Sequence, residues 1–198
     1  MKVKNIDLLA PDFVINCGGL SRSKEIYQIM REQGITRSYG YGFYYWCANR
    51  ILAPQFLKVG MSSPILGDRG YQVGERVVRQ AAWLPGWGEQ PKTSNGLDFW
   101  KNIEQDLIID KKISNTFNKN NVSIAIWDVT KRMDSANILR EQENIATAWV
   151  EGELANQHKK IYGALPPLNY TDPSQTKAYL GPHINRASFD ALFGFDPV

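Results

Sequence analysis

The chain has 198 residues, of which 43% are hydrophobic and 22% are charged, and its formal net charge at neutral pH is +3. This length and composition are typical of one globular domain with its own core. The sequence contains no internal repeat and no low-complexity tract. No apolar run approaches the roughly 18–20 residues that a membrane span needs, and the first residues lack the apolar stretch of a secretory signal, so we expect a cytoplasmic protein without membrane association.

The charge is distributed unevenly along the chain. Between Arg22 and Arg79 there are nine Lys and Arg against four Asp and Glu, whereas between Glu89 and Glu153 there are eleven acidic against eight basic residues. A positive half and a mildly acidic half suit a protein with one face that meets phosphates. A chance fluctuation on a solvated surface is the open alternative.

In chain order, residues 1–20 are expected to form an arm or cap. A helix is predicted over residues 24–31, capped by Ser21 or Ser23 and ended by Gly34. The aromatic-rich run from Tyr39 to Cys47 predicts a strand, because aromatic residues favour extended structure.

The second strand is predicted over residues 55–59, close enough to the first to pair as a hairpin. Helices are predicted from Glu75 to about Trp83 and over residues 97–109, and the alternating run 122–127 predicts a third strand.

A long helix is predicted over residues 136–162, capped by Asp134 or Ser135 and ended by Gly163, with an irregular tail after it. This order predicts an α+β fold with a small three-stranded antiparallel sheet flanked by helices. The expected division is an N-terminal arm and helix (1–38), a central domain (39–170) and an irregular C-terminal tail (171–198).

Both strands of the predicted hairpin carry a glycine and a polar side chain within three residues. The first run is Gly42-Phe43-Tyr44 and the second is Lys58-Val59-Gly60, and an arginine-bearing helix and a late glutamate follow them. This ordered set resembles the GIY-YIG nuclease family, over about residues 40–170. The resemblance implies the family's fold, with Tyr44 as a catalytic residue and Gly42 and Gly60 as structural residues.

Lys58 stands where most members of that family have a second tyrosine, and it is similar to the lysine of some restriction-endonuclease members. Two arginines compete for the position on the following helix. Arg69 lies nine residues after Gly60, whereas Arg76 begins a helical segment in which Arg79 and Gln80 follow one turn later. We favour Arg76, with Arg79 and Gln80 as candidate DNA contacts, and keep Arg69 as the alternative.

Two glutamates compete for the metal. The run from Val150 to His158 resembles the family's stretch of Glu-x-x-Leu with a polar tail, which favours Glu151 as the metal ligand. At about 100° per residue, however, Glu153 falls inside the apolar arc of the predicted helix and Glu151 outside it. Asn169 is similar to the family's asparagine after the last core helix, which implies that it fixes the backbone of the site.

The resemblance implies a metal-dependent DNA endonuclease. Tyr44, assisted by Lys58, would deprotonate water, the arginine would stabilise the charge of the transition state, and the glutamate would hold one Mg²⁺ or Mn²⁺ ion. Restriction and phage-encoded homing roles are both open, and a homodimer is expected for the restriction role. Two alternatives remain: a non-catalytic nucleic-acid-binding module on the same fold, and an unrelated aromatic-rich structural or virion protein.

Overall fold

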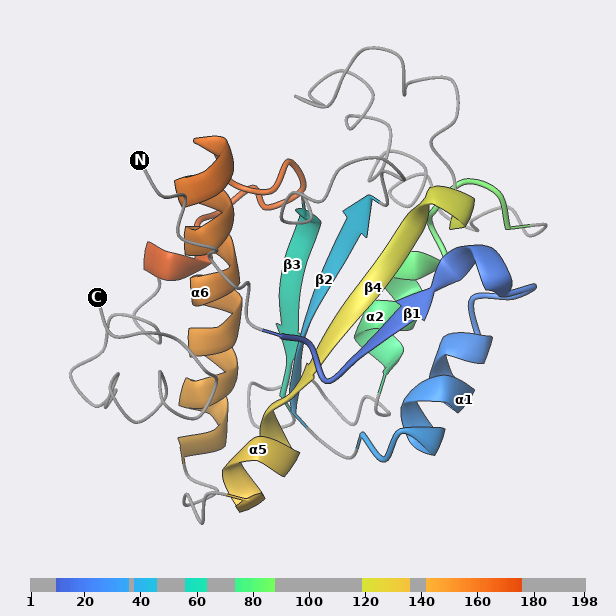
Figure 1. Cartoon of the computed structure of the whole chain (residues 1–198), viewed down its shortest axis with the longest axis horizontal. Helices are drawn as coiled ribbons and strands as arrows, with labels where there is room; N and C mark the ends of the chain where they lie inside the picture. The colour runs from blue at the N-terminus through green and yellow to red at the C-terminus, as the bar shows by residue number, and fades with distance from the viewer. Residues whose placement is uncertain are drawn as a thin grey trace.

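The structure is a computed structural model that describes residues 10–35, 38–45, 56–63, 74–87, 119–135 and 142–175. Within these residues, four strands form one antiparallel sheet in the order β1-β4-β2-β3 (Figure 1). The strands are β1 (Phe13–Asn16), β2 (Tyr39–Tyr45), β3 (Phe56–Ser62) and β4 (Val122–Asp128). The predicted α+β class is therefore confirmed for the described part of the chain.

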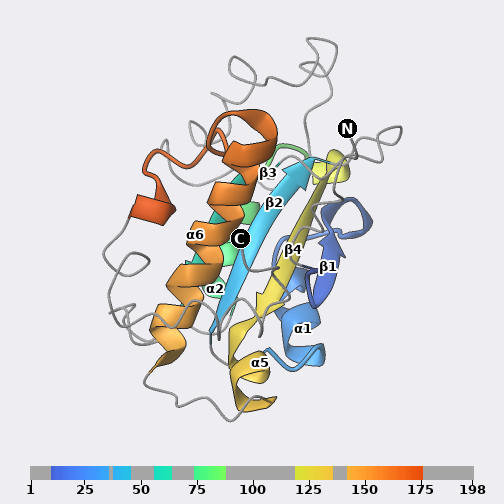
Figure 2. The same ribbon diagram turned by 60° about the vertical axis from the view of Figure 1, so that its left-hand side comes forward.

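Helices cover both faces of the sheet. On one face lie α1 (Glu25–Glu32) and α2 (Glu75–Ala81), and α5 (Val129–Ser135) and α6 (Glu143–Tyr162) pack against the other. Figures 1 and 2 both show α6 alongside β3, with α2 behind the sheet. Three short 3-10 turns complete the elements of this described part: η1 (Cys17–Gly19), η3 (Lys119–Asn121) and η5 (Pro173–Gln175).

The prediction of three strands is wrong by one. β1 comes from the segment predicted as an arm, and it pairs antiparallel with β4, from Phe13 opposite Ile126 to Asn16 opposite Ser123. Because the paired residues are more than 100 positions apart in the sequence, a local sequence pattern does not predict this pairing. Residues before 39 thus contribute one edge of the sheet and, through α1, part of the core.

The helix ends differ from prediction in two places. No serine caps α1: its N-cap residue is Lys24, which makes no side-chain cap bond. The backbone N–H of Arg22 donates to the Glu25 carboxylate at 2.9 Å. Asp134 and Ser135 belong to the short helix α5, so they do not cap the long helix.

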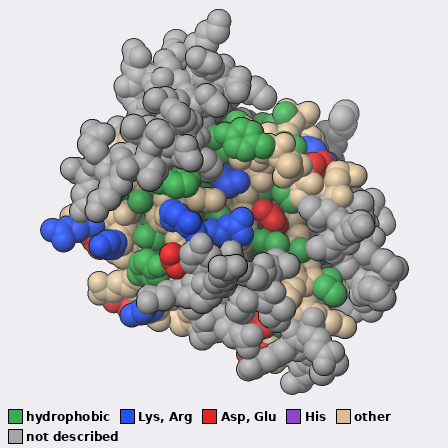
Figure 3. All heavy atoms as spheres, turned by 180° about the vertical axis from the view of Figure 1, so that it is seen from behind, with side chains coloured by type: hydrophobic (Ala, Val, Ile, Leu, Met, Phe, Trp, Pro, Cys, Tyr) green, Lys and Arg blue, Asp and Glu red, His purple; other side chains and the backbone are tan. Residues whose placement is uncertain are grey.

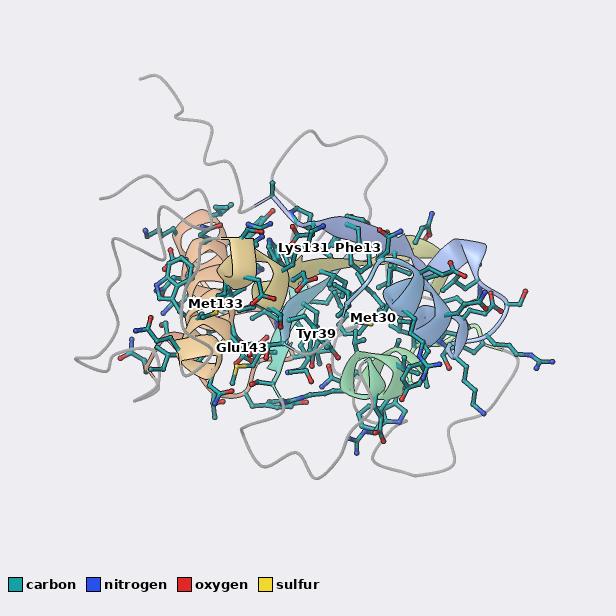
Figure 4. All side chains as sticks on the ribbon, turned by 90° about the horizontal axis from the view of Figure 1, so that it is seen from below. Phe13, Met30, Tyr39, Lys131, Met133 and Glu143 are labelled. Carbon is teal, nitrogen blue, oxygen red and sulfur yellow. The ribbon has the colours of Figure 1, made fainter. Side chains whose placement is uncertain are left out.

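Strand alternation divides the core into two clusters. Tyr39, Tyr41 and Phe43 point to the α1 and α2 face, together with apolar residues of α1, α2 and β4. Gly40, Gly42 and Tyr44 belong to the α6 face, where Tyr44 packs with Phe56 and Trp127. Figure 4 shows the division from below, with Met30 on the α1 side, Met133 on the α5 side and Tyr39 between them. The face on which a β2 side chain lies therefore follows its odd or even position.

A buried polar network holds the start of α6 against the strand ends. The Thr130 hydroxyl donates to Glu143 Oε1 at 2.6 Å and accepts from the Ser38 N–H at 3.0 Å. The Ser38 hydroxyl donates to Ser63, which in turn bonds Asn144. Because Glu143 is only 2% exposed, these partners decide whether its carboxylate is tolerated in the core.

The hairpin of β2 and β3, the helix at Glu75 and the strand at Val122 are confirmed. The helix predicted over residues 97–109 lies outside the described residues. In the part that the structure describes, no helix is long and apolar enough to cross a membrane.

Candidate functional site

Tyr41 lies across β2 and β3, over a residue that has no side chain. It pairs with Gly60, and a Cβ atom built on Gly60 would lie 2.5 Å from both Cζ and Oη of the Tyr41 ring. The ring is held on either side by Tyr39 and Phe43, whose centroids lie 6.0 and 5.9 Å away. Its hydroxyl donates to Gln80 Oε1 of α2 at 2.9 Å. Gly60 thus makes the space in which Tyr41 reaches α2.

Lys58 lies on the same face of the sheet. It pairs with Phe43, so it is the diagonal cross-strand neighbour of Tyr41. Its ammonium donates to the Leu168 carbonyl at 3.3 Å. Burial lowers the pKa of Lys58 below its ordinary value; the neighbouring Arg76 charge lowers it further, whereas Glu151 acts in the opposite direction. The site therefore favours the neutral amine more than water does.

Arg76 and Glu151 bring the other charges to this position from two helices. Burial raises the pKa of the Glu151 carboxyl, while Arg76 and Lys58 counteract that rise. The pKa of the Tyr41 phenol is raised mainly by its burial. The charge of Arg76 lowers this pKa and the charge of Glu151 raises it. Side chains from β2, β3, α2 and α6 therefore converge on one place.

The members of this cluster differ in exposure. Tyr41 is fully buried, whereas Lys58, Arg76 and Glu151 are half-buried and reach the surface. Figure 3 shows the face of the molecule behind the view of Figure 1, where Lys and Arg side chains gather near the middle beside acidic ones. Lys58, Arg76 and Glu151 can thus meet a ligand, and Tyr41 supports them from below.

Charged side chains continue along α2 toward α1. Arg79 is exposed, and its charge acts on Tyr27 together with the charge of Arg31 of α1, which is also exposed. Glu75 of α2 acts on Tyr27 in the opposite direction, so the surface between the two helices carries charges of both signs. Gln80, one residue further, is turned inward to Tyr41.

Asn169 fixes the edge of β3 beside Lys58. Its side chain accepts from the Val59 N–H at 2.9 Å and donates to the Val59 carbonyl at 3.1 Å, as a neighbouring strand would. Asn169 thus makes backbone hydrogen bonds to the strand that carries Lys58, and its role in a site stays a prediction. Gly42 has a packing role on the other face, because a Cβ there would lie 2.5 Å from the Phe56 ring.

The structure does not bring Tyr44 to the cluster. Its ring packs edge-on against Phe56 at 6.3 Å on the α6 face, and its pKa, raised by burial, is lowered in part by a hydrogen bond to Ser123. The assignment of the catalytic tyrosine to Tyr44 is corrected for this reason. Tyr41, three residues earlier and on the other face, is the β2 tyrosine that lies beside Lys58, Arg76 and Glu151.

The structure separates the two glutamate candidates, but it describes one of the two arginine candidates. Glu151, and not Glu153, acts on the pKa values of Tyr41 and Lys58, so Glu151 is the carboxylate of the cluster. Arg76 is the arginine of the cluster among the described residues, whereas Arg69 lies outside them.

One available signal would have identified Tyr41. In an antiparallel pair, residues opposite one another share a face, and Lys58 shares its face with Gly60 because they are two residues apart. A tyrosine of β2 can contact Lys58 only if its side chain points to the same face of the sheet. Its position must therefore be opposite Lys58 or Gly60, or an even number of residues away from such a position. Counting pairs from the hairpin selects Tyr39 and Tyr41 and excludes Tyr44, and of these two Tyr41 is the one opposite Gly60.

Glu151 is the one side chain of this cluster that is of the kind that binds a hard divalent cation. Glu151 supplies a carboxylate at the edge of the surface, and no group of three or more metal-ligating side chains occurs among the described residues. Mg²⁺ is often bound by one or two carboxylates, with water and substrate phosphate completing the shell. The burial that raises the Glu151 pKa is also a cost that a bound cation would offset.

Comparison with known proteins gives no relative for this chain. It matches no protein-family model, no curated protein and no solved structure.

Proposed function

We propose that this protein is a metal-dependent DNA endonuclease whose active site contains Lys58, Arg76 and Glu151, supported by Tyr41. The observation that carries the proposal is the convergence of these side chains from β3, α2, α6 and β2. An arginine, a lysine whose pKa is lowered and a carboxylate at one half-buried position suit the cleavage of an anionic ester, which needs charge neutralisation and a base.

Lys58 would accept the proton of the attacking water. A lysine serves as a base only when neutral, and burial lowers the Lys58 pKa in the required direction. Tyr41 is less suited to this task, because burial raises its pKa and encloses its hydroxyl. Its role would be to hold Gln80 and the floor of the site in place.

Arg76 would bind the non-bridging oxygens of the scissile phosphate and stabilise the charge that develops on them. Glu151 would hold Mg²⁺ or Mn²⁺, which when bound would stabilise the charge on the leaving oxygen. Arg79, beside Arg31 of α1, would contact neighbouring phosphates and position the DNA without reading its sequence.

A plasmid-cleavage assay with Mg²⁺ and matched variants tests this function. Lys58→Arg keeps a long basic side chain but removes the base, because a guanidinium stays protonated, and we expect at least a hundredfold lower rate. Glu151→Gln should abolish metal-dependent cleavage, whereas Glu153→Gln should retain it. Tyr41→Phe should lower the rate about tenfold by releasing Gln80, while Tyr44→Phe should leave it unchanged. Full activity of both Lys58→Arg and Glu151→Gln would refute the proposed site.

The second candidate is a nucleic-acid-binding module without catalysis. The specific observation in its favour is the buried Tyr41 hydroxyl with its raised pKa, which leaves the site without a tyrosine base. DNA binding by the wild-type protein, with no cleavage in Mg²⁺ or Mn²⁺, would establish this candidate. Restriction or homing roles, a phage setting, an intracellular location and a homodimer belong to the proposal and would be examined only after cleavage is established.

A further inference from the structure

The segment that follows α6 forms one wall of the proposed site. The Leu168 N–H donates to the Leu57 carbonyl at 3.0 Å, and Asn169 bonds both backbone groups of Val59. The Leu168 carbonyl accepts from the Lys58 ammonium. This segment therefore lies along the open edge of β3, beside the lysine of the site.

The same segment is fixed again three residues later. The Lys159 ammonium of α6 bonds the Asp172 carboxylate at 2.6 Å and the Ser174 hydroxyl at 3.0 Å. The other Asp172 oxygen accepts from both the N–H and the hydroxyl of Ser174, which is itself buried. Residues 170 and 171 are thus held between Asn169 and Asp172, both of which are anchored.

Tyr170 projects from this anchored segment. It is 72% exposed, and the other exposed large hydrophobic residue among those described is Val14, at 47% on β1, the strand at the opposite edge of the sheet. Two residues of extended chain span at most about 7 Å, so the Tyr170 backbone lies within about one nucleotide of the Leu168 carbonyl that contacts Lys58. An aromatic ring on a backbone that is already fixed pays little conformational entropy when it binds.

We propose that Tyr170 stacks on an unpaired nucleobase next to the phosphate that Arg76 binds beside Lys58, and that the preferred substrate is DNA with such a base near the scissile bond. This inference rests on the proposed function. Bases inside an intact duplex already stack on one another, so an exposed ring beside the phosphate finds a partner only where a base is mismatched, flapped or single-stranded. Stacking of this kind tolerates any base, because every base has a π face.

Binding to two oligonucleotides of the same sequence tests the proposal, one fully paired and one with a single mismatched 2-aminopurine beside the cleavage position. Cleavage is blocked by the Glu151→Gln background, and dissociation constants are measured by fluorescence anisotropy. We expect Tyr170→Ala to weaken binding of the mismatched DNA about tenfold or more and to leave the paired DNA unchanged. Tyr170→Phe and Tyr170→Trp should retain binding and the quenching of 2-aminopurine, and Val14→Ala is the matched control.

The outcomes separate this inference from the function beneath it. If wild-type protein cuts DNA but Tyr170→Ala binds the mismatched DNA as tightly as the parent does, stacking is refuted and the nuclease assignment stands. Equal weakening on both oligonucleotides also refutes stacking on an unpaired base, because a general contact has been lost. If wild-type protein neither binds nor cuts either DNA, both proposals fail.

Discussion

Replacing Gly60 with alanine should damage the site through Tyr41. The added Cβ would lie 2.5 Å from two atoms of the Tyr41 ring, against about 3.5–4.0 Å for an ordinary contact between carbon atoms. About 1 Å of movement must therefore be absorbed. The ring cannot simply swing aside, because Tyr39 and Phe43 flank it and its hydroxyl is bonded to Gln80.

The size of the effect follows from this overlap. Overpacking of a core costs about 1–3 kcal/mol, and for a chain of this length each kcal/mol lowers Tm by about 2–4 °C. A displacement of about 1 Å behind Lys58 and Arg76 should also lower the cleavage rate, on the order of 10- to 100-fold. The free energy of unfolding is measured by urea titration and the rate by single-turnover cleavage at saturating protein.

Gly42→Ala is the matched control. Its Cβ would lie 2.5 Å from the Phe56 ring, so the overlap is similar, but it falls on the α6 face away from Tyr41. We expect a similar loss of stability and a nearly unchanged rate per folded molecule. If Gly60→Ala loses stability but keeps the wild-type rate, Tyr41 does not support the site and the reasoning is refuted.

Substitutions at three further positions test the charges of the site and the hydrogen bonds of the fold. Because burial raises the Glu151 pKa, the contribution of this carboxyl to wild-type stability should fall as the pH rises above about 4.5. Glu151→Gln should therefore be more stable than wild type at pH 7. In thermal melts below about pH 4.5 the difference between the two proteins should vanish. Asn169→Ala leaves both backbone groups of Val59 without their partner and should cost about 2–4 kcal/mol in urea unfolding, and a loss under 0.5 kcal/mol would contradict its role. Glu143→Ala should lower the free energy of unfolding by about 1–3 kcal/mol, because the Thr130 hydroxyl loses its acceptor. Glu143→Gln keeps an acceptor and should lower it by less than about 1 kcal/mol. Equal losses for the two variants would show that the hydrogen bond to Thr130 is not the cause.

Local patterns predicted the elements whose stabilising contacts are close in sequence. The hairpin of β2 and β3, the helix beginning at Glu75 and the stop of α1 near Gly34, whose φ is +75°, all follow from periodicity, turn residues and backbone preference. β1 escaped prediction because four residues carry too little periodicity and their partner is β4, far along the chain. Pairing between strands so far apart in the sequence is decided by tertiary packing, about which a short stretch of sequence carries no information.

The choice between Glu151 and Glu153 shows where helix geometry alone fails. A helical wheel assumes one buried face, but α6 is buried on the sheet side and also against β3 and the segment after its own end. Residues on nearly every side of this helix are buried. Glu151 therefore lies outside the sheet-facing arc and yet comes close to Lys58, because the edge of β3 provides a second contact surface.

The tyrosine assignment depends on which face of the sheet carries the site, and that face is decided by Lys58. Its position opposite Phe43 places it on the α2 side, where Arg76 already lies. A phenol on the α6 side, such as that of Tyr44, would need to cross the sheet to reach the same phosphate. A sequence motif specifies the spacing of residues along the chain. A site on a sheet also requires that the side chains from neighbouring strands point to the same face. Any variant that shifts the β2–β3 register by one residue should therefore exchange Tyr41 for Gly42 at the site and abolish activity while conserving every residue of the motif.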